Sequence, residues 1–133
     1  MTQTFVYLSE DWAAEALKRL QEQLPPEKMN NVSTSMSNIY KNCPEGGEKY
    51  LFTLCENGAV TAVEVGSGEP PKAEFVITGE YETFAKISRA EMGSQRALMT
   101  GKLKLKGNMA RALKLASLAD RMNKILSQIP ATY

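Results

Sequence analysis

The first thirty residues combine a short apolar run with one helical pattern. The run at residues 4–8 (TFVYL) predicts a short strand or an extended arm. Apolar side chains then recur every three or four positions: Trp12, Ala16, Leu17, Leu20 and Leu24. Ser9 is a favourable N-cap and Pro25 cannot continue a helix, so we expect an amphipathic helix between them. Its apolar face should lie against a sheet or another helix.

After this helix, the pattern changes to short β-rich runs separated by turn residues. The runs occupy residues 32–42, 50–55, 59–65 and 73–78. Asn57 and Gly58 join the second run to the third, and Asn-Gly favours a two-residue hairpin because both positions need a positive φ. Four strands are therefore expected after the first helix.

The last third of the chain returns to a helical period that one strand interrupts. Residues 81–88 and 94–99 predict short helices, and the alternation in Lys102–Lys106 (KLKLK) predicts a strand with leucines inward and lysines in water. A broad apolar stripe from about residue 108 to residue 129 predicts a long final helix. This order favours an α+β fold with helices on one face of a sheet, in a single domain over residues 1–133.

Composition places the chain among ordinary globular proteins. The length of 133 residues suits one domain, and 43% hydrophobic and 23% charged side chains are near average values. No apolar run approaches the ~20 residues that span a bilayer. Residues 1–8 carry no basic side chain, which is unlike a secretion signal. We therefore expect a cytoplasmic protein.

Side chains suited to catalysis or metal binding are scarce. Histidine is absent, which removes the commonest general base and the commonest metal ligand. Cys43 and Cys55 are the only cysteines, and their spacing matches neither a disulfide framework nor a zinc site. An enzyme would need a carboxylate or tyrosine, such as Asp120 or Tyr81, to act alone. We expect no catalysis, no metal and no cofactor.

Charge is divided along the chain. Residues 1–85 carry 6 basic and 13 acidic side chains, a balance of −7, whereas residues 86–133 carry 10 and 2, a balance of +8. Two interpretations remain open. The halves can attract each other across the folded surface, or the basic end can meet phosphate on a ligand head group or an anionic membrane.

The most specific pattern lies near the lysine-rich strand. Residues 95–109 read QRALMTGKLKLKGNM, and residues 112–115 read ALKL. This succession of a small helix, glycine, a lysine-rich strand, Gly-Asn-Met and a helix with Leu-Lys-Leu resembles the sterol-carrier-protein family of lipid transfer domains. Specific resemblance covers about residues 75–118, and the order of predicted elements extends it over the remainder.

The resemblance implies a five-stranded mixed or antiparallel sheet covered on one face by helices, with an apolar tunnel between the layers. The tunnel would hold a fatty acid, a fatty acyl-CoA, a sterol or a phospholipid tail, without covalent chemistry. The residues that the resemblance assigns to the ligand are Phe84, Ile87, Gln95, Ala97, Leu98, Met99, Leu103, Leu105, Met109, Leu113, Ala116 and Met122. Ordinary core packing remains the alternative for each apolar member.

Basic side chains form a second candidate site, for CoA phosphates or a membrane surface: Arg96, Lys102, Lys104, Lys106, Arg111 and Lys114. The alternative for the three strand lysines is a solvated, protected sheet edge. A nucleic-acid or protein-interaction module using the basic C-terminal third is the competing function. That region lacks the interleaved aromatic residues that stack on bases, so we expect no nucleic-acid partner. The expected partners are a lipid or acyl-CoA molecule and a transient anionic membrane contact, and the oligomeric state, a homodimer included, stays open.

Overall fold

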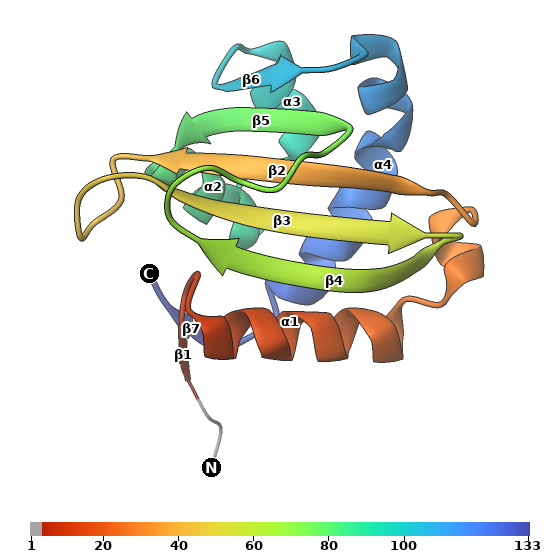
Figure 1. Ribbon diagram of the computed structural model, residues 1–133, viewed down its shortest axis with the longest axis horizontal. Helices are drawn as coiled ribbons and strands as arrows, with labels where there is room; N and C mark the ends of the chain where they lie inside the picture. Colours follow the sequence, from red (N-terminus) through yellow and green to blue (C-terminus); the bar gives the residue numbers. More distant parts are fainter. Residues whose placement is uncertain (1–3) are drawn as a thin grey trace.

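A five-stranded sheet with helices against one face forms the body of the protein (Figure 1), described for residues 4–133 in a computed structural model. The strands follow the spatial order β4-β3-β2-β5-β6. Their bounds are β2 (Thr34–Lys41), β3 (Lys49–Glu56), β4 (Ala59–Gly66), β5 (Phe75–Glu80) and β6 (Leu103–Lys106). Only β2 and β5 pair in parallel, so the sheet is mixed and the expected α+β fold class is confirmed.

The helices are α1 (Glu10–Gln23), α2 (Tyr81–Ser88), α3 (Ser94–Met99) and α4 (Met109–Leu126), with a short 3-10 helix, η1 (Pro26–Met29). α2, α3 and α4 lie behind the sheet in Figure 1, and α1 runs along β4 and contacts α4. No helix within residues 4–133 has the length and apolarity needed to cross a bilayer.

The first helix forms where the pattern predicts it. The Ser9 hydroxyl accepts a hydrogen bond from the Trp12 amide at 3.1 Å, which caps the helix. The apolar stripe is buried, and Trp12 is only 1% exposed. Burying a large apolar side chain stabilises a fold by about 1.5–3 kcal/mol, so this stripe holds α1 in place. The proline pair ends α1 but then starts η1, which periodicity did not reveal, because proline is tolerated in a first helical turn.

The hairpin between β3 and β4 is also confirmed. Asn57 and Gly58 have φ values of 51° and 86°, which are those of a type I′ turn. A Cβ on Gly58 would lie 2.6 Å from the Pro26 carbonyl oxygen, so this position needs glycine for space as well as for φ.

Alternation along β2 divides its side chains between the two faces of the sheet. The row that faces the helices includes Met36, Asn38 and Tyr40. On the other face, the Ser37 hydroxyl donates a hydrogen bond to the Pro71 carbonyl at 3.0 Å. The loop between β4 and β5 crosses the sheet there (Figure 1). The helix-facing row is therefore the one that can form a site.

The two ends of the chain meet in a second, two-stranded sheet that the sequence did not predict. β1 (Phe5–Val6) pairs in parallel with β7 (Ala131–Thr132). α4 ends at Leu126, three residues before the expected 129, because the chain must leave the helix to reach this pairing. β1 lies within residues 4–8, where the sequence predicts a short strand or an extended arm. The argument about a secretion signal concerns residues 1–8, and residues 1–3 lie outside the described residues.

Candidate functional site

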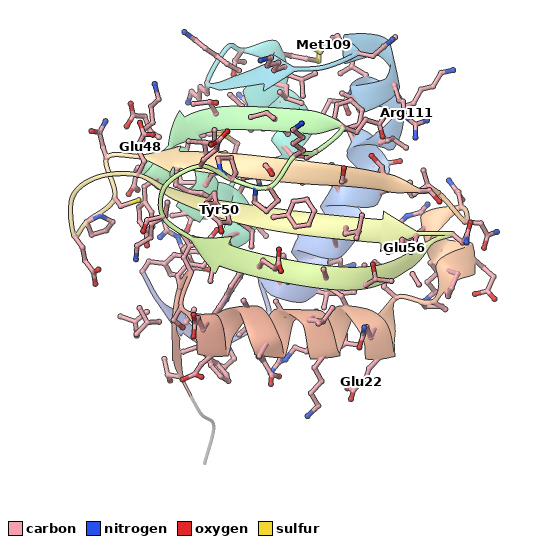
Figure 2. All side chains as sticks on the ribbon, viewed as in Figure 1. Glu22, Glu48, Tyr50, Glu56, Met109 and Arg111 are labelled. Carbon is pink, nitrogen blue, oxygen red and sulfur yellow. The ribbon has the colours of Figure 1, made fainter. Side chains whose placement is uncertain are left out.

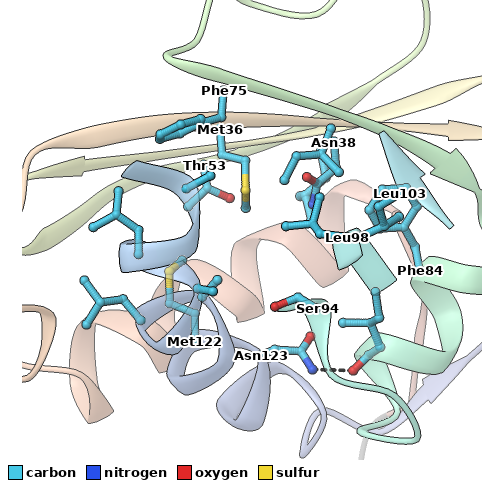
Figure 3. A pocket seen from close by; sticks show the side chains of 18 of the residues that line it. Met36, Asn38, Thr53, Phe75, Phe84, Ser94, Leu98, Leu103, Met122 and Asn123 are labelled. Carbon is cyan, nitrogen blue, oxygen red and sulfur yellow. Dashed lines mark hydrogen bonds between the residues drawn. The ribbon is translucent and has the colours of Figure 1, made fainter. Parts of the chain in front are cut away.

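A cavity of about 150 Å³ lies between the sheet and the helices α2, α3 and α4 (Figure 3). Alternate residues of four strands form its floor, among them Met36, Asn38, Thr53, Cys55, Phe75, Ile77, Leu103 and Leu105. Side chains of three helices form its roof, among them Phe84, Ile87, Ser94, Leu98, Ala116, Met122 and Asn123. The cavity therefore occupies the interlayer space in which a closely packed α+β protein would place its core.

The space exists because the roof presents small side chains above the middle of the sheet. Ala112, Ala116 and Ala119 recur at helical spacing on the cavity side of α4. Beneath the roof, Met36 and Asn38 are only half-buried although they lie on the central strand. Closely packed interiors leave few such voids, so the incomplete burial of a central strand indicates that the helices do not close fully onto the sheet.

Polar contacts join the helices of the roof to one another. The Asn123 side-chain amide on α4 donates to the Ile87 carbonyl of α2 (Figure 3). The Ser94 hydroxyl at the start of α3 donates to the Asp120 carboxylate of α4 at 2.7 Å. The three helices are therefore tied into one layer.

The first half of α4 is held differently, by one arginine. Met109, Leu113 and Lys114 are exposed to solvent, so the first turns of the helix bury less apolar surface than the later turns, where Ala116, Leu118, Met122 and Ile125 are buried. The Arg111 guanidinium reaches across to the sheet, where it pairs with the Glu74 carboxylate and donates to the Ser33 carbonyl at 3.2 Å. An exposed ion pair contributes only about 0.2–1 kcal/mol, so this part of the roof is weakly attached.

Glu74 accepts a second hydrogen bond at the same rim. The Thr34 hydroxyl donates to it at 2.6 Å. Burial alone would raise the pKa of Glu74, but the hydrogen bonds from Thr34 and Arg111 and the charge of Arg111 outweigh it and lower the pKa below its usual value. Glu74 is therefore ionised at neutral pH and stays paired with Arg111.

One end of the cavity carries uncharged hydroxyl groups. The hydroxyls of Tyr7 and Tyr40, which both line the cavity, lie 3.2 Å apart, and the Ser88 hydroxyl lies 3.0 Å from that of Tyr133. Burial raises the pKa of Tyr7 and of Tyr40 well above the usual tyrosine value, so both stay neutral. Among residues 4–133, no Asp, Glu, Lys or Arg lines the cavity. An apolar guest with at most an uncharged polar group matches this lining.

The structure places the predicted ligand residues in two groups. Seven of them line the cavity: Phe84, Ile87, Leu98, Leu103, Leu105, Ala116 and Met122. Ala97 is instead 0% exposed and belongs to the packed core. Met99, Met109 and Leu113 are 73%, 48% and 38% exposed, and Gln95 also faces solvent. The structure does not bring these five to the cavity wall, because Ala97 packs into the core and the other four side chains face solvent.

Of the three alanines that create the space, sequence reasoning found Ala116 and missed Ala112 and Ala119. The alanines of α4 recur at three- and four-residue spacing, which is the one signal that was available in advance. Asn38 and Thr53 were missed because polar residues on a strand favour the solvent face. Ser94 lines the cavity in place of its neighbour Gln95.

The basic side chains also separate into groups. Arg96 and Lys102 line a polar surface hollow beside the loop between α2 and α3. Lys104, Lys106 and Lys114 are exposed, and none of these five is in an ion pair with another described residue. Arg111 differs, since it is paired with Glu74. Ion pairs between the two charged halves of the chain thus engage Arg111 and Arg89, and the five cations named above remain exposed or on the surface hollow.

Metal binding has no support in the part of the chain that the structure describes. No group of acidic, cysteine or histidine side chains within residues 4–133 is arranged to hold an ion. Cys43 and Cys55 are free, buried thiols. Burial raises the pKa of each, so both are in the protonated form at neutral pH.

Known proteins resemble this chain in sequence and in fold. Hydroxysteroid dehydrogenase-like protein 2 from Bos taurus is 36% identical over 83 residues, which is 62% of this chain and 19% of the relative. A crystal structure of sterol carrier protein 2 superposes with a TM-score of 0.80 at 22% identity, covering 92% of this chain and 98% of that one. A protein of Thermus thermophilus, described as possibly a sterol carrier protein, has a TM-score of 0.80 at 21% identity, covering 99% of this chain and 94% of that one.

These comparisons do not all establish the same thing. At such identities the solved structures establish the fold alone, and this chain spans about a fifth of the length of the curated relative it matches. The model of the SCP-2 sterol transfer family, by contrast, matches residues 8–120. Because this match covers most of the sequence, the chain belongs to the SCP-2 sterol transfer family.

Proposed function

We propose that this protein binds one apolar lipid chain between its sheet and its helices and carries it without covalent chemistry. The observation that carries the proposal is the incomplete burial of Met36 and Asn38, which lie on the central strand yet face open space. Membership of a lipid transfer family supports the same function. The fatty acid, fatty acyl-CoA, sterol and phospholipid tail remain the candidate ligands.

The energetics of such binding are favourable. Each buried methylene contributes about 0.8 kcal/mol, so a chain of about twelve yields on the order of 10 kcal/mol. Association then costs several kcal/mol in lost freedom of motion. With a cost of about 4 kcal/mol the balance is about 6 kcal/mol, which corresponds to a dissociation constant of tens of micromolar.

Entry of a long chain requires the roof to move. A cavity of about 150 Å³ is the size that accommodates benzene, whereas pockets for larger ligands measure ~300–1,000 Å³. The first turns of α4 are the segment best suited to swing outward, because Arg111 supplies the ion pair that joins them to Glu74 and several of their other side chains are exposed. Met36 and Met122 can repack around guests of varied shape, since the methionine side chain is flexible and polarizable.

A charged head group belongs outside the cavity, which has no charged lining among the described residues. We propose that the basic surface formed by Arg96, Lys102, Lys104, Lys106 and Lys114 receives it, either as the phosphates of an acyl-CoA or as an anionic membrane from which the lipid is taken. Cations that lack a carboxylate partner among the described residues remain available for phosphate, which supports this role. A cytoplasmic location is part of the same proposal.

Titration with a fluorescent fatty acid analogue tests the function. We expect saturable binding at one site per chain by a monodisperse sample, with displacement by an unlabelled fatty acid. Native mass spectrometry of the freshly purified protein then identifies any copurified lipid. Absence of saturable binding by folded protein would contradict the proposal.

A further inference from the structure

Asn38 is a polar side chain in the cavity floor with an apolar partner on each side across the sheet. It lies at the middle of β2, and its register partners on the neighbouring strands are Leu51 on β3 and Ile77 on β5. All three side chains line the cavity. In Figure 3 the Asn38 amide extends from the sheet into the space below, on the same side as Leu98 of α3.

The amide oxygen of Asn38 has no partner. Its Oδ1 atom is buried and accepts no hydrogen bond from any residue of the described chain. A buried acceptor that is left unpaired is destabilising, because it has given up its hydrogen bonds to water. An unpaired amide oxygen can accept a hydrogen bond from a donor on a bound ligand.

The surroundings of Asn38 restrict what that donor can be. No charged side chain within residues 4–133 lines the cavity, so an ionised carboxylate or phosphate would be buried there without a counter-ion. The neighbouring hydroxyls of Tyr7 and Tyr40 remain neutral because burial raises their pKa. An alcohol hydroxyl is uncharged, and it can donate the hydrogen bond that the Asn38 Oδ1 atom is free to accept.

We propose that Asn38 is the head-group determinant of this cavity: its amide oxygen accepts a hydrogen bond from the hydroxyl of a lipid alcohol, which therefore binds with its hydroxyl innermost. A lipid with an ionised head binds in the opposite direction, with its head at the basic surface and its tail inside. This inference rests on the proposed lipid-binding function and adds to it the residue that distinguishes the two ligand classes.

Three ligands of equal chain length test the inference on the unaltered protein. Dodecanol, dodecyl methyl ether and dodecanoate compete against a fluorescent alkyl probe at pH 8. Dodecanol should bind about tenfold more tightly than its methyl ether, which lacks the donor, because one hydrogen bond to a buried acceptor is worth about that factor. Equal affinity for the alcohol and the ether would overturn the inference.

Substitutions then assign the effect to one residue. Asn38→Leu, which keeps the number and branching of the side-chain heavy atoms, should reduce the alcohol-to-ether ratio to about one, and Asn38→Ala provides a second variant if the first folds poorly. Thr61→Val removes a hydroxyl from β4 outside the cavity and should retain the tenfold ratio. A preference for alcohol that survives in both Asn38 variants would overturn the assignment. If the unaltered protein binds no probe at all, the proposed function itself fails, and the two failures are thus distinguishable.

Discussion

Arg111 on α4 and Glu74 at the start of β5 form an ion pair across the rim of the cavity. Each has a neighbour in sequence that lines the cavity, Ala112 and Phe75, so this pair fastens the roof to the floor. Met109, Leu113 and Lys114 in the first turns of α4 are exposed, as Figure 2 shows for Met109. The pair is therefore placed to control how readily the cavity opens.

Removing the ion pair should accelerate lipid exchange. We expect Arg111→Gln to raise the dissociation rate of a bound fluorescent lipid by up to about fivefold, because exposed ion pairs contribute about 0.2–1 kcal/mol. Stopped-flow displacement measures this rate. Glu15→Gln, which removes a pair with Arg19 on α1, is the matched control and should leave the rate unchanged. A rate in Arg111→Gln equal to that of the control would show that the pair does not restrain the roof.

The same pair predicts a dependence on pH. The pKa of Glu74 is lower in the folded protein than in the unfolded chain, so its contribution to stability is fully present above the unfolded pKa and is lost as pH falls through the folded pKa. The difference in free energy of unfolding between the protein and Glu74→Gln should therefore be constant near neutral pH and disappear in acid. Urea titrations at a series of pH values measure it. A difference that persists at the acid end would contradict the assignment.

Filling the cavity from the roof should block binding. Ala116 faces the cavity and is buried, whereas Leu113, one turn earlier, is exposed. We expect Ala116→Trp to lower lipid affinity at least tenfold, while Leu113→Trp leaves it unchanged. Ala112→Trp at the rim is a milder second blocker, and thermal unfolding checks that each variant folds. Equal affinities in the Ala116 and Leu113 variants would place the ligand elsewhere.

Much of the fold was accessible from sequence because its signals are local. The Ser9 cap, the Asn57-Gly58 turn and the alternating Lys102–Lys106 strand each depend on residues a few positions apart, and all three predictions are confirmed. The parallel pairing of β1 with β7 joins opposite ends of the chain, and no periodicity within either segment records it.

The cavity was less accessible, because hydrophobic patterns identify apolar side chains and do not measure the space between them. On α4 the bulky residues Met109 and Leu113 were the stronger signal, yet both are exposed, and the cavity wall includes three alanines whose small size leaves room. Asn38 is polar, and a polar residue on a strand is normally expected to face solvent. Only the paired sheet shows that its side chain faces the helices.

The basic surface should matter for charged ligands alone. Replacing Arg96, Lys102 and Lys104 together by Ser should weaken binding to vesicles containing anionic lipid and to an acyl-CoA, and leave the affinity for dodecanol unchanged. Replacing Lys28, Lys41 and Lys72, which are exposed elsewhere, removes the same charge as a control. Vesicle co-sedimentation at two salt concentrations provides the measurement. An equal loss of vesicle binding in both triple variants would show that only the net charge matters, and it would contradict a specific role for this surface.

The methionines provide the most direct test that the sheet and helices enclose room for a guest. Met29, Met36 and Met122 line the cavity, whereas Met99 and Met109 are exposed. In protein labelled with ¹³C at the methionine methyl groups, addition of dodecanol should shift the three cavity signals, saturating at one ligand per chain, and leave the two surface signals in place. Shifts confined to Met99 and Met109, or unshifted signals at ligand concentrations well above the expected dissociation constant, would contradict the account.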